Sequence, residues 1–261
     1  MRTSAKTIVA SGMPRSGSTL VFNYLLYMCQ TCYQNRFENL RYIDLHYLDV
    51  FGSEPYHWES RYQSIFDFNN KNDIVLFKSH CLKLIDIVSL EKFSEVKPIC
   101  TIRSIQDAAK SLIYLGSNHD TNHDKVIRDT TLLLRESIRS IVHQHPYALM
   151  IDYTRLITNP ISCLKDIVNF ASFDVNEDQL HLCCEKFLYK NIVSYLAKLP
   201  EDSNDKHCLW NQKHLTKPRS APVDRWQEVV DQLLPDIADL RDRTGLNLLV
   251  AQSLDHSELM P

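Results

Sequence analysis

The feature that most constrains the fold is a short glycine loop near the start of the chain, Gly-Met-Pro-Arg-Ser-Gly-Ser-Thr at residues 12–19. The loop follows an apolar stretch at 6–11 that predicts a buried strand. Apolar residues at helical spacing then run from Thr19 to Met28. In a strand–loop–helix unit, the amides of the loop and the helix N-terminus form a cradle for an anion. The sequence therefore predicts a phosphate-binding loop at the edge of a sheet.

The rest of the chain alternates short apolar runs with amphipathic stretches. Three further strands are predicted at residues 74–77, 98–102 and 148–151, and further helices at 105–115, 126–143, 161–171 and 226–240. This alternation is typical of βαβ units, so we expect an α/β fold with a P-loop-like parallel sheet flanked by helices. In such sheets, ligands bind beyond the carboxyl ends of the strands.

Length, charge and hydropathy limit the organisation and the partners of the chain. A length of 261 residues suits a single domain over residues 1–261, with an irregular lid or cofactor segment around 200–224. The formal net charge of −3 argues against a nucleic-acid partner. No run of about 18 apolar residues predicts a membrane span, and the N-terminus does not resemble a signal peptide. We therefore expect a cytoplasmic protein whose eight cysteines are free thiols.

The loop differs from that of a kinase at one position. Ser18 stands where the G-x-x-x-x-G-K-[ST] pattern places its lysine, which helps to hold the β- and γ-phosphates of a nucleoside triphosphate. The cation of this loop lies upstream, at Arg15. The loop is therefore suited to a 5′-phosphate ester with a shorter and less charged tail.

The run Pro-Arg-Ser-Gly-Ser-Thr-Leu at 14–20 resembles the 5′-phosphosulfate loop of sulfotransferases that use 3′-phosphoadenosine-5′-phosphosulfate (PAPS). In that family the loop has the form P-[KR]-[SA]-G-[TS]-[TS] and lies between the first strand and the first helix. The resemblance implies that five residues hold the phosphosulfate, namely Arg15, Ser16, Gly17, Ser18 and Thr19.

A second element, Lys-Ser-His at 78–80, directly follows the second predicted strand and resembles the K-[TS]-H element of the cytosolic sulfotransferases. A histidine near its ordinary pKa suits a general base at neutral pH. The resemblance implies that His80 deprotonates the acceptor hydroxyl while Lys78 and Arg15 stabilise the leaving phosphate. Some family members use a glutamate instead, so Glu38 and Glu54 stay open as alternative bases.

A third element begins at Arg103, which ends a predicted strand, and reaches Ser111 about two helical turns later. An arginine and a hydroxyl at one ligand edge suit a terminal phosphate. The element resembles the family's 3′-phosphate site, R-[DN]-P-x-[DE]-x-x-x-S, and Asp107 fits this pattern. Ser104 and Ile105 replace the usual acid–proline pair. The resemblance implies that Arg103 and Ser111 bind the 3′-phosphate.

The C-terminal third carries weaker matches to the same family. Residues 153–160 resemble its [YF]-[ED]-x-L-x-x-x-P strand-to-helix connection, for which we expect a mainly architectural role, and residues 224–226 resemble its [GD]-[RK]-W helix start. The family commonly has R-K-G-x-x-G-D-W here, and this chain lacks those glycines. We expect Lys217, Arg219 and Ser220 to reach the 3′-phosphate or to cover the adenine.

The resemblance of these elements to the family implies an enzyme that transfers a sulfuryl group from PAPS to a hydroxyl of a small-molecule acceptor, releases PAP, and uses no metal. The aromatic and acidic segment at 34–72 suits a small-molecule pocket. The chain resembles small bacterial sulfotransferases of secondary metabolism, including those that sulfate guanidinium toxins such as cylindrospermopsin. Two alternatives stay open: a P-loop kinase acting on a small alcohol, and a non-catalytic module that binds PAP or PAPS. The sequence gives no oligomeric state.

Overall fold

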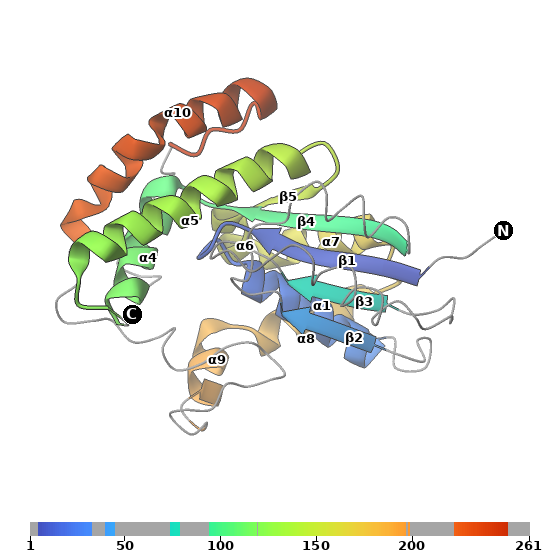
Figure 1. Cartoon of the computed structure of the whole chain (residues 1–261). Helices are drawn as coiled ribbons and strands as arrows, with labels where there is room; N and C mark the ends of the chain where they lie inside the picture. The colour runs from blue at the N-terminus through green and yellow to red at the C-terminus, as the bar shows by residue number, and fades with distance from the viewer. Residues whose placement is uncertain are drawn as a thin grey trace.

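The structure is a computed structural model that describes residues 5–32, 40–44, 74–78, 94–118, 120–196, 198 and 222–249. Its centre is a sheet with the strand order β2-β3-β1-β4-β5, and every neighbouring pair is parallel (Figure 1). The strands are β1 (Ala5–Gly12), β2 (Leu40–Asp44), β3 (Ile74–Lys78), β4 (Ser94–Ile102) and β5 (Leu149–Asp152). The predicted α/β fold with a parallel sheet is confirmed.

The helices follow the amphipathic stretches of the sequence. They are α1 (Ser18–Cys32), α4 (Ile105–Ser117), α5 (His123–Gln144), α6 (Tyr153–Thr158), α7 (Pro160–Ala171), α8 (Glu177–Lys186), α9 (Tyr189–Leu196) and α10 (Trp226–Thr244), with a 3-10 turn η2 (Val223–Arg225) before α10. The sequence did not predict β2, α6, α8 or α9. Asn176 and Gln179 form a capping box at the start of α8, and this pair is a signal that would have located that helix.

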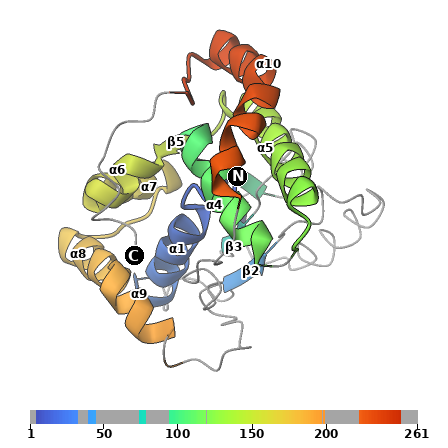
Figure 2. The same ribbon diagram turned by 90° about the vertical axis from the view of Figure 1, so that its left-hand side faces the viewer.

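Alternating residues of the strands serve two separate cores, because successive side chains of a strand point to opposite faces of the sheet. Ile8, Ala10 and Ile99 pack with α1, α7 and α8 on one face. Cys100 packs with α4, α5 and α10 on the other face. Figures 1 and 2 show these two helical layers on either side of the sheet. Helices on both faces leave the carboxyl edge of the sheet as the place for a site.

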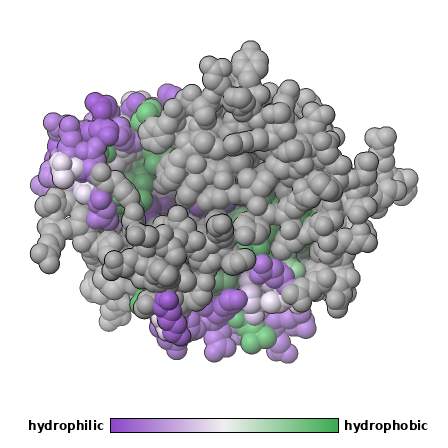
Figure 3. Space-filling model, turned by 60° about the horizontal axis from the view of Figure 1, so that its bottom comes forward, coloured by the Kyte–Doolittle hydropathy of each residue, from purple (hydrophilic) through white to green (hydrophobic). Residues whose placement is uncertain are grey.

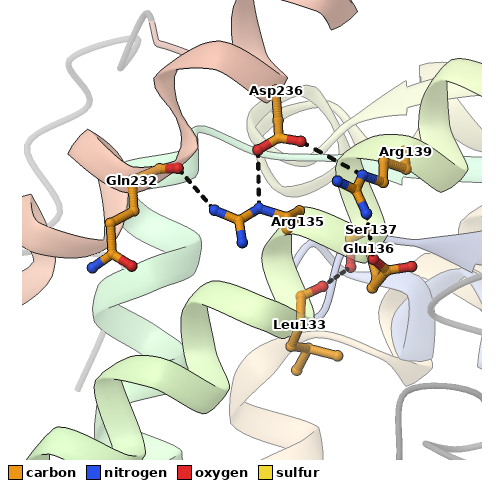
Figure 4. Close-up of polar contacts among 7 residues, drawn as sticks. All are labelled: Leu133, Arg135, Glu136, Ser137, Arg139, Gln232 and Asp236. Carbon is orange, nitrogen blue, oxygen red and sulfur yellow. Dashed lines mark hydrogen bonds and ion pairs between the residues drawn. The ribbon is translucent and has the colours of Figure 1, made fainter. Parts of the chain in front are cut away.

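Ion pairs hold α10 against α5 (Figure 4). The Nε of Arg135 donates to Asp236 at 3.0 Å, and its Nη2 donates to the carbonyl oxygen of Gln232 at 3.0 Å. Arg139 approaches the other carboxylate oxygen of Asp236 at 3.6 Å. Beneath them, Val229, Leu233, Ile237 and Leu240 of α10 are buried. Helix α10 is therefore fixed to the layer that also contains α4.

On the face shown in Figure 3, the visible described residues are mainly hydrophilic, with apolar residues beside them. Exposed apolar side chains such as those of Leu132 and Leu182 are ordinary on a protein surface. Within the described ranges, no helix combines the length and the apolar character that crossing a membrane requires. The prediction of a single domain over 1–261 stays a prediction, and residues 200–221 of the expected lid lie outside the described residues.

Candidate functional site

Three neighbouring strands bring the predicted donor-binding residues to one edge of the sheet. Lys78 is the last residue of β3, Arg15 lies in the loop after β1, and Arg103 directly follows β4. Since β1 lies between β3 and β4, with Gly12 opposite Thr101, these three cations leave the sheet at its carboxyl edge. Topology alone therefore places positive charge from three separate segments at the expected anion site.

The glycine loop turns sharply before α1 begins at Ser18. Arg15 has a φ of 67°, in the left-handed region that residues other than glycine rarely adopt. The Nη1 of Arg103 donates to the carbonyl oxygen of Arg15 at 3.1 Å, and this bond holds the loop in that conformation. Ser18 and Thr19 are the first two residues of α1, so their backbone amides lie at the positive end of the helix dipole. The loop has the geometry of an anion cradle.

Gly17 is required by the packing under the loop. Its φ is 91°, and a Cβ atom there would lie 2.8 Å from Cδ2 of Leu156 and 3.1 Å from Cδ2 of Tyr153. These two residues belong to α6, in the connection that the sequence predicted to be architectural. The glycine loop therefore packs directly against this connection.

Arg103 contacts three separate parts of the site, namely the glycine loop, α6 and α4. Its side chain is only 7% exposed, and its guanidinium carbon lies 4.4 Å from the ring centroid of Tyr153, a stacking arrangement. Asp107, one turn into α4, approaches its Nε at 3.9 Å. The Nε is buried and has no hydrogen-bond partner among the described residues. Asp107 is therefore close enough to this nitrogen for an ion pair but too far for a hydrogen bond.

Arg15 joins the glycine loop to the arginine/serine element. Its Nε donates to the hydroxyl of Ser111 at 2.9 Å. Ser111 is 9% exposed and faces this edge from α4, two turns beyond Arg103, as the spacing predicted. The structure thus brings Arg15, Arg103 and Ser111 together into one cluster, although they come from two distant segments of the chain.

The residue replacements in the third element are explained by the start of α4. Ser104 is the N-cap of this helix, and its hydroxyl accepts from the backbone amide of Asp107 at 3.2 Å. Serine and aspartate are both favoured N-caps, so Ser104 can cap the helix as the usual acid would. Ile105 is the first helical residue, a position at which proline is common.

Ser16 differs from its loop neighbours because its polar groups face the protein. The side chain is fully buried, and its hydroxyl contacts the carbonyl oxygen of Met13 and the backbone and side-chain oxygens of Thr101. Its amide donates to Met13 as well. These contacts give Ser16 a structural role in the loop, and a contact of this residue with the donor stays a prediction.

A buried polar network below the loop was not predicted from the sequence. The hydroxyl of Ser11, the residue before Gly12, contacts the side-chain oxygen of Gln144 and the carbonyl oxygen of Ile99. The amide of Gln144 donates to the hydroxyl of Ser140 at 2.7 Å. Ser11 and Gln144 are fully buried. The end of α5 therefore fixes the last residues of β1, from which the loop starts.

The remaining predicted residues divide into two groups. Lys78 is fully buried at the end of β3. His80, the alternative bases and the C-terminal basic residues lie outside the described residues: His80, Glu38, Glu54, Lys217, Arg219 and Ser220. Among the described residues, no group of histidines, cysteines and acids could hold a metal ion. Six cysteines lie in the described ranges, and five of them are buried free thiols, namely Cys29, Cys100, Cys163, Cys183 and Cys184.

A family model of the sulfotransferase domain matches residues 5–233. The chain belongs to the sulfotransferase family. This assignment confirms the predicted class, a PAPS-dependent sulfotransferase, and it favours sulfuryl transfer over the kinase alternative. The match begins in β1 and ends within α10, so it includes the loop and the arginine/serine element.

Solved structures of the same fold support the assignment. Retinol dehydratase in complex with retinol and PAP is 16% identical, with 94% of this chain and 83% of that chain covered and a TM-score of 0.54. Mouse sulfotransferase SULT7A1 complexed with PAP is 11% identical, with coverage of 94% and 87% and a TM-score of 0.56. No curated protein sequence matches this chain at a significant level. At these identities, the similarity to the solved structures shows only that this chain shares their fold.

Proposed function

We propose that this sulfotransferase transfers the sulfuryl group of PAPS to a hydroxyl of a small-molecule acceptor, with the donor lying across the carboxyl ends of β3, β1 and β4. The observation that carries the proposal is the cluster of Arg15, Arg103 and Ser111. It joins the 5′-phosphosulfate loop to the 3′-phosphate element through two hydrogen bonds of 2.9 and 3.1 Å. A nucleotide with phosphates at both ends of its ribose fits such a cluster.

The residues of the cluster fit this donor by their chemistry. The buried Nε of Arg103 has no hydrogen-bond partner among the described residues, and a buried donor of this kind favours an anionic acceptor. Stacking on Tyr153 holds the guanidinium in place before the ligand arrives. We assign the 3′-phosphate to Arg103 and Ser111, and the 5′-phosphosulfate to the loop residues 15–19.

In the proposed reaction, His80 takes the proton of the acceptor hydroxyl as the hydroxyl oxygen attacks sulfur. The bond between sulfur and the bridging oxygen breaks, and PAP leaves with the bonding electrons. Lys78 and Arg15 stabilise the negative charge that develops on the leaving phosphate. A lysine buried at the end of β3 supports this assignment, because the low local dielectric strengthens its attraction for an anion.

The acceptor is proposed to be a small hydroxylated metabolite of secondary metabolism, with hydroxylated guanidinium toxins as the specific candidates. Structures of retinol dehydratase hold retinol or androsterone, which are small hydroxylated molecules. The acidic residues in segment 34–72 favour a cationic acceptor. We place the reaction in the cytoplasm, where the described free thiols stay reduced.

The test is transfer of radiolabelled sulfate from PAPS to a panel of hydroxylated guanidines, steroids and simple alcohols. His80→Ala should abolish turnover and leave PAP binding unchanged. His181→Ala, at an exposed position on α8, is the matched control and should behave as the wild type. Normal turnover in His80→Ala would contradict the base assignment, and Glu38→Gln and Glu54→Gln would then identify the base. Turnover of no acceptor, together with tight PAP binding, would favour the non-catalytic module.

A further inference from the structure

The chain continues beyond the family match and returns to the donor site. After α10 ends at Thr244, Gly245 adopts a φ of 74° and reverses the direction of the chain. The amide of Leu246 donates to the hydroxyl of Thr244 at 3.1 Å, which fixes the reversal. Leu248 is 3% exposed and packs in the core formed by α4, α5 and α10. We call residues 245–249 the C-terminal strap.

The C-terminal strap ends on the first residue of α4. The amide of Ile105 donates to the carbonyl oxygen of Leu248 at 3.0 Å. The first amides of a helix have no partner within the helix, and Ile105 is 1% exposed, so this amide requires an acceptor from another segment. The C-terminal strap supplies that acceptor two residues from Arg103.

Ile105 and the C-terminal strap complement each other. The family pattern usually has a proline at this position, and a proline has no amide hydrogen to satisfy. This chain instead has an isoleucine, whose buried amide would be unsatisfied without the C-terminal strap. The N-cap Ser104 and the side chain of Arg103 precede this amide directly, and Ser111 follows on the same helix. A shift at the start of α4 therefore moves both residues of the 3′-phosphate pair.

We propose that the C-terminal strap positions Arg103 and Ser111 for the 3′-phosphate of the donor, through the hydrogen bond between Ile105 and Leu248. Ile105 and Leu248 are thus positioning residues. The inference rests on the proposed function, because it assumes that this pair binds the 3′-phosphate. It predicts that loss of the bond lowers the affinity for PAP more than the affinity for AMP, which lacks the 3′-phosphate.

The first test replaces the amide donor and keeps the helix. Ile105→Pro removes the N–H at a position where proline is accepted. Ser104 has a ψ of 136°, a conformation that a residue before proline adopts readily. Ile105→Val keeps the N–H and is the matched control. Calorimetric titration of the full chain should show that Ile105→Pro weakens PAP by about 3- to 10-fold, as expected for one lost hydrogen bond. AMP should lose less affinity than PAP, and Ile105→Val should bind both as the wild type does.

The second test needs no substitution. Coupling is reciprocal, so saturating PAP should slow amide hydrogen exchange at Ile105 and in the C-terminal strap of the wild-type protein by about the same 3- to 10-fold. Saturating AMP should slow this exchange less than PAP does. Unchanged exchange with PAP, or equal loss of PAP and AMP affinity in a folded Ile105→Pro, would overturn the inference.

A third variant separates this inference from the proposed function. Arg103→Ala should lose the preference for PAP over AMP outright. If it keeps that preference, the assignment of the 3′-phosphate is wrong. If Arg103→Ala loses the preference and Ile105→Pro keeps it, the assignment stands and the positioning role of the C-terminal strap is wrong.

Discussion

Replacement of Gly17 by alanine tests how closely the phosphate loop packs against α6. The backbone φ of 91° disfavours any residue with a Cβ, and a left-handed conformation costs an L-residue roughly 1–2 kcal/mol. The new Cβ would also lie 2.8 Å from Leu156 and 3.1 Å from Tyr153. Overpacking of this kind costs roughly a further 1–3 kcal/mol. Gly17→Ala should therefore lower the free energy of unfolding by about 2–5 kcal/mol.

Thermal unfolding measures this effect, at about 2–4 °C for each kcal/mol in a chain of this size. Gly245→Ala is the matched control. Gly245 also has a positive φ, but its added Cβ would meet no atom within 4 Å, so it should incur only the conformational cost. Because the loop must shift to accept the new methyl group, Gly17→Ala should also weaken PAP binding by more than about tenfold. Equal melting temperatures for the two variants, or unchanged PAP affinity in Gly17→Ala, would refute the packing argument.

Three further predictions follow from buried groups. Arg103→Ala should weaken PAP by about 10- to 100-fold in calorimetric titration, the value of a charge-assisted hydrogen bond, and a smaller loss would contradict its role. Gln144→Leu should lower the free energy of unfolding by about 1–3 kcal/mol in urea, because it removes the buried hydrogen bonds of Gln144 with the hydroxyls of Ser11 and Ser140; an unchanged midpoint would count against the network. Burial raises the pKa of Cys100 to about 12 and of Cys184 to about 11. Both thiols should therefore resist alkylation at pH 8 until the protein unfolds. In the unfolded state the thiols lose their protons at a lower pH than in the folded state. The free energy of unfolding should therefore fall as the pH rises above about 9.

The sequence located the sheet because buried parallel strands appear as apolar runs, and four of the five described strands were predicted this way. The start of β4 was placed too late, at Pro98, because proline seldom lies inside a strand. Among the described residues, β5 pairs with β4 only from Ile99 onward, so the amide that Pro98 lacks removes no hydrogen bond to β5. β2 was missed because it is a short edge strand whose sequence, LRYID, lacks a clear apolar alternation.

In the candidate site, too, local sequence patterns predicted some features and missed others. Arg15, Arg103 and Ser111 were predicted from local motifs, and the structure brings them together. The stacking of Arg103 on Tyr153 and the bond from Ile105 to Leu248 join residues 50 or more positions apart in the sequence. No local pattern encodes such pairs, because they depend on how the helices pack around the sheet. The one sequence feature that pointed to the hydrogen bond of Ile105 is the isoleucine itself, which stands where the family pattern usually has a proline.

The most direct test of the central claim is calorimetric titration of the purified protein with PAP, with ATP and magnesium as the comparison. The account predicts tight binding of PAP that needs no metal, a large loss of that affinity in Arg103→Ala, and no response to ATP. Binding of ATP with magnesium and indifference to PAP would contradict the account, and would show that the glycine loop serves a kinase reaction.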